Sequence, residues 1–367
     1  MTPTLASRHR APPARAMRGM TLIELLVALT IGLLVTLVAV AALIAGQGGY
    51  RAVDATADLR DRQRFALTQI AELVKQTGYE NGTLRKSATR VNELRAGTAR
   101  ADLYEPDVFG WNNSTFVMSQ ATTAGGAIST ATMTARPGSD TTGSDILVIR
   151  FQGSSAGLAP DGSANDVADN SMINCAGGGV PGILNVTGGA LDINSRPASA
   201  LYVDTSSGEP NLMCATYQYN PATTSWAWSA SPIPLVEGVE SFQVLYGVQG
   251  ITPGAAVAAA SAELTSSHNL EPPMDRWLRA DQLNVSTDPA GTRRNWRQVR
   301  AIKIGIVMRG APGSAQDKTA TTFYPLGTGY ESASDKGSKF VVTPADNRLR
   351  QVATLTLHLP NWLTLNN

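Results

Sequence analysis

The sequence has little of the material that catalysis needs. Its 367 residues include three histidines and two cysteines, and charged residues make up only 16% of the chain. No pattern in the sequence pairs a poised serine or cysteine with a matched base, and no GxxxxGK[ST] motif offers a phosphate cradle. We therefore expect a protein without enzymatic activity, catalytic residues or a cofactor, and we exclude a motor ATPase.

An excess of charge of either sign is also missing. Thirty basic residues against 29 acidic ones leave a net charge of +1, so no general positive field exists to hold nucleic acid. Apolar residues reach 43%, which is enough to fill a core, and 34 glycines and 20 prolines indicate a loop-rich exported β domain. Nucleic acid is therefore not an expected partner.

One long apolar run is present near the N-terminus. Residues 25–46 contain no charge over 22 positions, and as a helix they would measure about 33 Å, close to the ~30 Å hydrocarbon core of a bilayer. Residues 1–19 contain four arginines and no acidic residue, and charges of both signs follow the run. By the positive-inside rule, the N-terminus stays in the cytoplasm and the chain after about residue 47 lies outside.

A cleaved secretory signal peptide is the alternative, since Ala39-Val40-Ala41 offers a partial cleavage site. The run is longer than the ~7–15 residues of a signal core. Glu24 stands directly before the run, in the first turn of the expected helix, where an unpaired charge costs roughly 2.5–3.5 kcal/mol at mid-bilayer and less near the interface. Glu24 therefore needs a partner, unless its carboxylate merely reaches the interface.

The start of the run resembles the class III leader junction of type IV pilins and type II secretion pseudopilins, through Arg18-Gly19-Met20-Thr21-Leu22-Ile23-Glu24-Leu25-Leu26-Val27. The resemblance implies that a prepilin peptidase removes residues 1–19 by cutting after Gly19, and that Met20 is N-methylated. It gives Glu24 the role of pairing with the N-terminal amine of a neighbouring subunit in the filament core. Such a pair forms only between correctly staggered subunits, so Glu24 would set the assembly register.

The next segments predict one long helix. Residues 20–46 form its membrane and filament-core part, and residues 47–78 an amphipathic part. Gly46, Gly48 and Gly49 weaken the helix between the two parts. One apolar stripe comprises Leu59, Ala66, Leu67, Ile70, Leu73 and Val74. Gly78 is placed as the residue past the helix C-terminus.

Residues 79–367 predict a periplasmic β-rich globular domain, because short apolar runs alternate with Gly, Pro, Ser, Thr and Asp clusters. Strands are expected at residues 115–118, 145–151, 201–204, 213–219, 226–228, 239–246, 300–308, 339–342 and 351–359. The last long runs alternate polar and apolar residues, so we expect one sheet face to be covered, by the long helix, and the other to be exposed. The fold class is thus α+β. The resemblance implies a type IV pilin-like fold, with the helix packed on an antiparallel sheet that carries long loops.

Further runs resemble the PilW group of minor pilins: Arg64-Phe65-Ala66-Leu67 before Gly78-Tyr79, residues 235–247 (LVEGVESFQVLYG) and residues 296–301 (WRQVRA). Asn81-Gly82 stand where the resemblance would place a cysteine, which leaves no disulfide at that corner. The resemblance implies a non-enzymatic minor pilin of an initiation or tip complex in the inner membrane and then at the cell surface. Its partners would be other minor pilins, the major pilin and the prepilin peptidase, with no small-molecule substrate. A J-like minor pseudopilin of type II secretion and a membrane-tethered binding module or adhesin are the alternatives.

The two cysteines, Cys175 and Cys214, both lie on the exported side. An oxidising compartment and an even count favour one disulfide, which would stabilise the domain by roughly 3–4 kcal/mol in the chain-entropy model. A free buried pair is the alternative. The CxxC spacing of redox and zinc sites is absent.

Other candidate sites have simpler interpretations. Asp161, Asn165, Asp166 and Asp169 could supply oxygen ligands to Ca²⁺, but their spacing does not match a calcium loop, so we expect a solvated loop and no metal. Tyr217, Trp226, Trp228 and Trp296 could form an exposed patch for DNA or a receptor, but strand aromatics usually belong to the core. His9, His268 and His358 have no context for a catalytic triad.

Overall fold

The computed structural model describes residues 19–79, 105–122, 133–137, 142–157, 167–182, 186–187, 190–191, 196–205, 208–220, 223, 225–257, 274–315, 321–342 and 346–360. Contacts divide the chain into two compact units, Met1–Val53 and Asp54–Asn367. The boundary lies inside the first helix, so the second part of that helix belongs to the same unit as the β-rich domain. Asn81 and Gly82, where the PilW resemblance would place a cysteine, lie outside the described residues.

Helix α1 (Leu22–Lys75) is 54 residues long, and its helical assignment continues through Gly46 and Gly49. In the first unit, the segment Leu22–Ile44 has a mean hydropathy of 2.8 and none of it is buried. It is long and apolar enough to cross a membrane. The hydroxyls of Thr30 and Thr36 each donate to a carbonyl three residues earlier, at 2.8 Å. The side-chain donors of these two threonines therefore need no water inside a bilayer.

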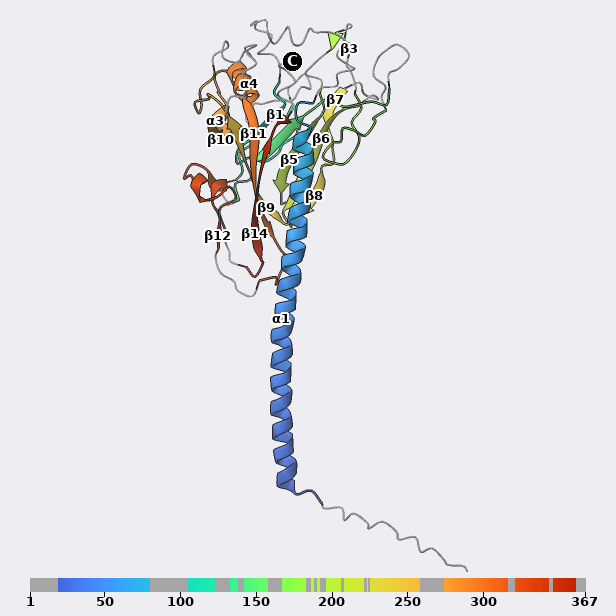
Figure 1. Ribbon diagram of the computed structural model, residues 1–367, viewed down its shortest axis with the longest axis vertical. Helices are drawn as coiled ribbons and strands as arrows, with labels where there is room; N and C mark the ends of the chain where they lie inside the picture. Colours follow the sequence, from blue (N-terminus) through green and yellow to red (C-terminus); the bar gives the residue numbers. More distant parts are fainter. Residues whose placement is uncertain are drawn as a thin grey trace, which may run out of the picture. The chain divides into compact units, whose positions relative to one another are not determined.

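In the second unit, α1 packs through the predicted apolar stripe. Leu59, Ala66, Ile70, Leu73 and Val74 are at most 4% exposed and belong to the main core cluster. Figure 1 shows this part of α1 running along strands of the β domain, and it lines cavities with Leu201 and Leu235. The amphipathic helix is confirmed. The helix stop is confirmed as well, because Gly78 has φ +70° and its N–H donates to the Arg150 carbonyl at 2.9 Å.

The domain contains two main antiparallel sheets. The first has the order β1-β2-β5-β6-β7, with β8 also paired to β6, and the second has the order β10-β9-β11-β14. The first comprises β1 (Val108–Trp111), β2 (Ile146–Arg150), β5 (Ala198–Asp204), β6 (Asn211–Asn220), β7 (Ser225–Trp228) and β8 (Ile233–Glu237). The second comprises β9 (Val239–Val248), β10 (Arg276–Leu278), β11 (Val299–Arg309) and β14 (Arg350–His358). The α+β class, a long N-terminal helix followed by antiparallel sheets, is confirmed.

Smaller elements lie between these strands. They are the pairs β3 (Val186–Thr187) with β4 (Ala190–Leu191) and β12 (Thr322–Phe323) with β13 (Phe340–Val341), the helices α3 (Ala280–Leu283) and α4 (Pro289–Arg297), and the 3-10 turns η4 (Thr328–Tyr330) and η5 (Lys336–Ser338). Helix α4 begins with Asp288, whose side chain accepts from the Gly291 N–H, and with proline at its first position.

A single glycine joins the two sheets. Gly238 stands between β8, in the first sheet, and β9, in the second, with φ +82°. A Cβ atom at this position would come within 2.6 Å of the Arg309 carbonyl oxygen. Only glycine therefore fits this corner, which lies inside the L-V-E-G-V run that resembles PilW.

Two of the expectations for strands are wrong. Residues 115–118 form a loop: the Thr115 N–H bonds to the Thr134 carbonyl, while the Val117 N–H turns to the Met133 sulfur, so no ladder continues. Strand β11 alternates in sequence but is buried along almost its whole length. Residues 321–342 cover its second face, where Pro325 closes on Gly305 and Tyr330 bonds to Lys303 at 3.2 Å. Strand β14 does show the expected alternation of partly buried and exposed residues.

A buried carboxyl connects the two sheets. Asp145 accepts hydrogen bonds from the Asn113 N–H at 2.9 Å and from the Val244 N–H of β9 at 2.8 Å. Burial and the nearby Asp335 raise the pKa of Asp145 well above its usual value, and the two N–H donors and Arg136 only partly oppose this. The folded domain therefore binds the proton on Asp145 more tightly than the unfolded chain does.

This pKa predicts the sign of one pH effect. A raised folded-state pKa gives stability that is complete below the unfolded pKa, about 3.9, and that is lost as the pH rises through the folded pKa. As the pH rises from about 4, we expect the wild type to lose more free energy of unfolding than Asp145→Asn does. Denaturant titrations of both proteins at several pH values measure this difference, and a difference independent of pH would contradict the prediction.

Candidate assembly site

The junction that resembles a leader cleavage site lies just before α1. Gly19 and Met20 are exposed and non-helical, and Met20 is 66% exposed. A Cβ atom added to Gly19 would meet no atom of the described chain within 4 Å. Packing within the described chain therefore does not require glycine at position 19, and the peptide bond between Gly19 and Met20 is accessible.

Glu24 takes part in a capping box at the start of α1. The Thr21 N–H and hydroxyl donate to Oε2 of Glu24 at 2.9 and 3.0 Å, and the Glu24 N–H approaches the Thr21 hydroxyl at 3.3 Å. This reciprocal arrangement satisfies donors that a helix start leaves free. The T-x-x-E spacing is legible in the sequence, and our sequence interpretation did not use it. Both bonds to the carboxylate fall on Oε2, so Oε1 can accept a further hydrogen bond or ion pair.

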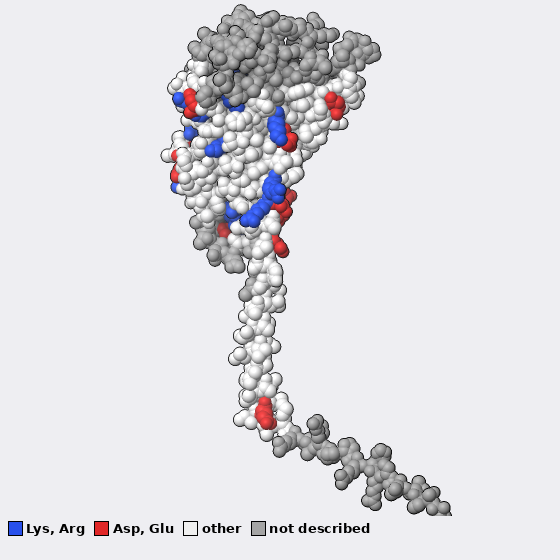
Figure 2. Space-filling view, viewed as in Figure 1, with Lys and Arg blue, Asp and Glu red and all other residues white. Residues whose placement is uncertain are grey.

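The rest of the first unit presents apolar side chains to its surroundings. Exposed fractions in the span range from 48% at Val27 to 81% at Leu22. Figure 2 shows this part of the chain almost free of charge, with one acidic side chain at its first turn, which the sequence identifies as Glu24. The span therefore offers a continuous apolar surface for lipid or for neighbouring helices, with one carboxylate at its beginning.

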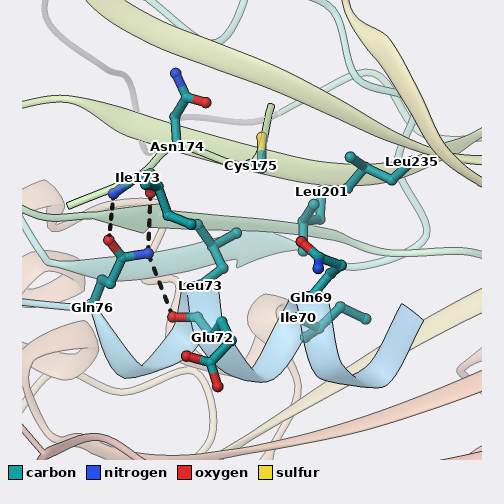
Figure 3. A pocket seen from close by; sticks show the side chains of 10 residues that line it. All are labelled: Gln69, Ile70, Glu72, Leu73, Gln76, Ile173, Asn174, Cys175, Leu201 and Leu235. Atoms are coloured by element: carbon teal, nitrogen blue, oxygen red, sulfur yellow. Dashed lines mark hydrogen bonds between the residues drawn. The ribbon is translucent and has the colours of Figure 1, made fainter. Parts of the chain in front are cut away.

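The end of α1 is held by a loop that a disulfide attaches to the first sheet. The Gln76 amide donates to the Ile173 carbonyl at 3.0 Å and accepts from the Ile173 N–H at 2.8 Å (Figure 3). Two residues later, Cys175 is joined to Cys214 of β6, with Cα atoms 5.8 Å apart. The structure thus brings the two cysteines together, and their bond holds the loop that contacts α1.

The remaining candidate residues do not gather into a site. Tyr217, Trp228 and Trp296 are at most 8% exposed, and Trp226 stacks on Tyr217 at 5.6 Å, so these four aromatics are packed and do not form an exposed patch. Trp296 belongs to a different cluster, with its ring 4.7 Å from that of Tyr246.

The structure describes only part of the acidic loop that was expected to be solvated and to hold no metal. Asp169 bonds to Ser154 and Ser171, which lowers its pKa. Asp161, Asn165, Asp166, His9 and His268 lie outside the described residues. Within the part of the chain that the structure does describe, no three His, Cys, Asp or Glu side chains form a group that could hold a metal ion. His358 stands exposed on β14 opposite Ala301.

One surface feature was missed by sequence reasoning. Phe65 is 51% exposed on α1 and lines a groove with Leu235 and Val236 of β8. Its position off the buried stripe was visible in the sequence, but the segment was interpreted only as part of the PilW resemblance. The groove itself depends on β8, which the sequence did not indicate as a separate strand because Pro234 interrupts the run.

Comparison with known proteins identifies the N-terminal segment first. Residues 14–40 match the prokaryotic N-terminal methylation motif. The chain has an exposed cleavage junction, then an apolar helix with a carboxylate in its first turn, and then, later in the sequence, an antiparallel β domain. These features define a protein of the type IV pilin class.

The C-terminal half narrows the class. Residues 200–361 match the family of type IV pilus-assembly protein W (PilW), and the chain is a PilW-like minor pilin of type IV pilus assembly. Among solved structures, the type IV-like pilin TTHA1219 from Thermus thermophilus is similar over 83% of this chain and 97% of its own, with 13% identity and a TM-score of 0.33. No curated relative matches the chain.

Proposed function

We propose that this minor pilin acts by packing rather than by chemistry, within the initiation or tip complex of a type IV pilus. The precursor sits in the inner membrane with its N-terminus in the cytoplasm and its β domain in the periplasm. A prepilin peptidase cuts after Gly19 and Met20 becomes the methylated N-terminus. The mature chain then joins other minor pilins and the major pilin. The observation that carries this proposal is the exposed Gly19–Met20 junction directly ahead of an uncovered apolar helix.

Gly19 fits the role of a recognition residue. The surrounding described chain leaves room for a side chain at position 19. The glycine is therefore needed for binding of this segment to the peptidase and not for packing. The backbone at residues 19–21 is exposed and non-helical, so it can bind in a protease site as an extended peptide.

Glu24 fits the role of a register residue. One carboxylate oxygen caps the chain's own helix through Thr21, and the other pairs with the N-terminal amine of the neighbouring subunit. Both charges are costly in an apolar helix bundle, so only the stagger that brings them together is stable. The span supplies the packing surface and Glu24 selects one axial position on it.

The decisive measurement is the mass and N-terminal sequence of the protein from membranes of cells with and without the prepilin peptidase. We expect a chain that begins at N-methylated Met20 only when the peptidase is present. Retention of residues 1–19 in both strains, or cleavage near Ala41, would refute the assembly role and leave a tethered or secreted binding domain.

A further inference from the structure

The groove beside Phe65 has the composition of a docking site. It lies between α1 and β8, has a volume of about 330 Å³, and is lined by Asp61, Arg62, Phe65, Leu235, Val236 and Glu237. Phe65 is 51% exposed, and among the described side chains of the second unit only Val167 and Ile233 are other large apolar residues on the surface. A half-exposed aromatic beside a partly apolar floor is the kind of anchor that protein interfaces bury.

The rim of this groove is acidic. Asp61 and Glu237 are exposed at its two sides, while the one basic lining residue, Arg62, is already paired with Asp58 at 3.0 Å. Asp54, Asp61 and Phe65 lie on one line along α1, at intervals of seven and four residues, with Asp58, the partner of Arg62, between the first two. An occupant must therefore bring positive charge on an element that runs parallel to this line.

The same helix carries the complementary charge on a different line. Arg60 and Arg64 are both exposed and lie four residues apart, about a quarter turn of the helix away from the acidic line. Figure 2 shows acidic and basic side chains in adjacent positions along this part of the molecule. One α1 helix thus offers an acidic groove on one side and a basic stripe, Arg60 with Arg64, on the other.

We propose that the groove receives the basic stripe of α1 from a second copy of this chain. Two different patches on one molecule make a heterologous contact, and it joins only those copies that stand next to each other in the complex. Phe65 is buried under the incoming helix, and Asp61 and Glu237 face Arg64 and Arg60 of that helix. This inference rests on the proposed function, since copies anchored in one membrane with the same orientation have parallel α1 helices that can meet side by side.

The contact can be tested in trans with the full chain in membranes. One tagged copy carries Glu237→Cys in the groove, a differently tagged copy carries Arg60→Cys on the stripe, and oxidation reports hetero-tagged dimers. The matched control replaces Arg60→Cys by His358→Cys, an exposed position on β14. We expect dimers from the groove and stripe pair, and about tenfold fewer from the control pair.

Charge reversal then tests complementarity. Asp61→Arg in the groove copy, or Arg64→Asp in the stripe copy, should each lower the yield about tenfold, and the two together should restore it. Each copy keeps its own altered helix in the restored pair, so a change within one helix cannot explain recovery. A yield no higher than that of the control, or the absence of recovery, would overturn the contact between copies and point to a different pilin as occupant. Leader removal is measured in the same membranes, because loss of cleavage after Gly19 would refute the proposed function instead.

Discussion

Replacing Glu24 with glutamine should abolish incorporation into pili while leaving leader cleavage intact. Glutamine keeps an oxygen for the Thr21 N–H and is as suitable as glutamate at this position of a capping box, so the helix start survives. It removes the charge that the proposal pairs with a neighbouring amine. Losing one partner of a buried charge pair costs about 2–5 kcal/mol, which corresponds to on the order of 30-fold or more in association.

The measurement is the amount of this protein in sheared surface pili relative to the amount in membranes. Thr21→Ala is the matched control, because it removes a side chain from the cap, at a cost of about 1 kcal/mol, and keeps the Glu24 charge. We expect this variant to assemble nearly as well as the wild type. If both variants assemble normally, or if Thr21→Ala is the more severe, Glu24 serves the chain's own helix and not the register between subunits.

The features that depend on local sequence could be predicted, whereas those that depend on contacts between distant segments could not. The N-terminal segment is interpretable residue by residue, because its features are local: a leader, a glycine, a carboxylate and an apolar run of sufficient length. The apolar stripe from Leu59 to Val74 and the stop at Gly78 are local in the same sense. None of these inferences requires knowledge of which segments meet in space.

The β domain depends on contacts between distant segments, and there the sequence is insufficient. It indicated most strands, but not that Gly238 divides them between two sheets, because a glycine between apolar runs looks the same in a hairpin and at a sheet corner. It suggested an exposed face on β11, where residues 321–342 lie instead. It also gave no sign that Arg150 and Arg196 are almost completely buried, each paired with a carboxylate, Glu105 and Asp107 respectively.

A buried ion cluster holds the second sheet to the end of the first. Glu240 of β9 accepts from Arg350 of β14 at 2.6 and 3.0 Å and from Arg309 of β11 at 3.0 Å. The side chains of Glu240 and Arg350 are 8% and 5% exposed. Arg309 also reaches Glu209, which stands just before β6 of the first sheet, at 2.7 Å. The cluster thus joins three strands of one sheet and contacts the other.

Glu240→Ala should therefore be among the most destabilising single changes in the domain. It leaves Arg350 buried with only Asp346 as an acidic partner and deprives Arg309 of one of its two carboxylates. Breaking a buried ion pair by removing one partner costs about 3–5 kcal/mol, and we expect the lower part of that range because Asp346 and Glu209 remain. Denaturant unfolding of the full chain in detergent, with the disulfide kept oxidised, measures the loss.

The exposed pair between Glu331 and Lys339 provides the control. Its atoms are 3.1 Å apart, close to the distances in the buried cluster, but the two side chains are 44% and 45% exposed. Water already solvates both charges there, so Glu331→Ala should change the free energy of unfolding by no more than about 0.5 kcal/mol. Similar small losses in both variants would mean that the ion cluster adds little to the packing and hydrogen bonds that hold the two sheets together. A large loss confined to Glu240→Ala would show that burial, and not the distance between the charges, gives the ion cluster its role in joining the sheets.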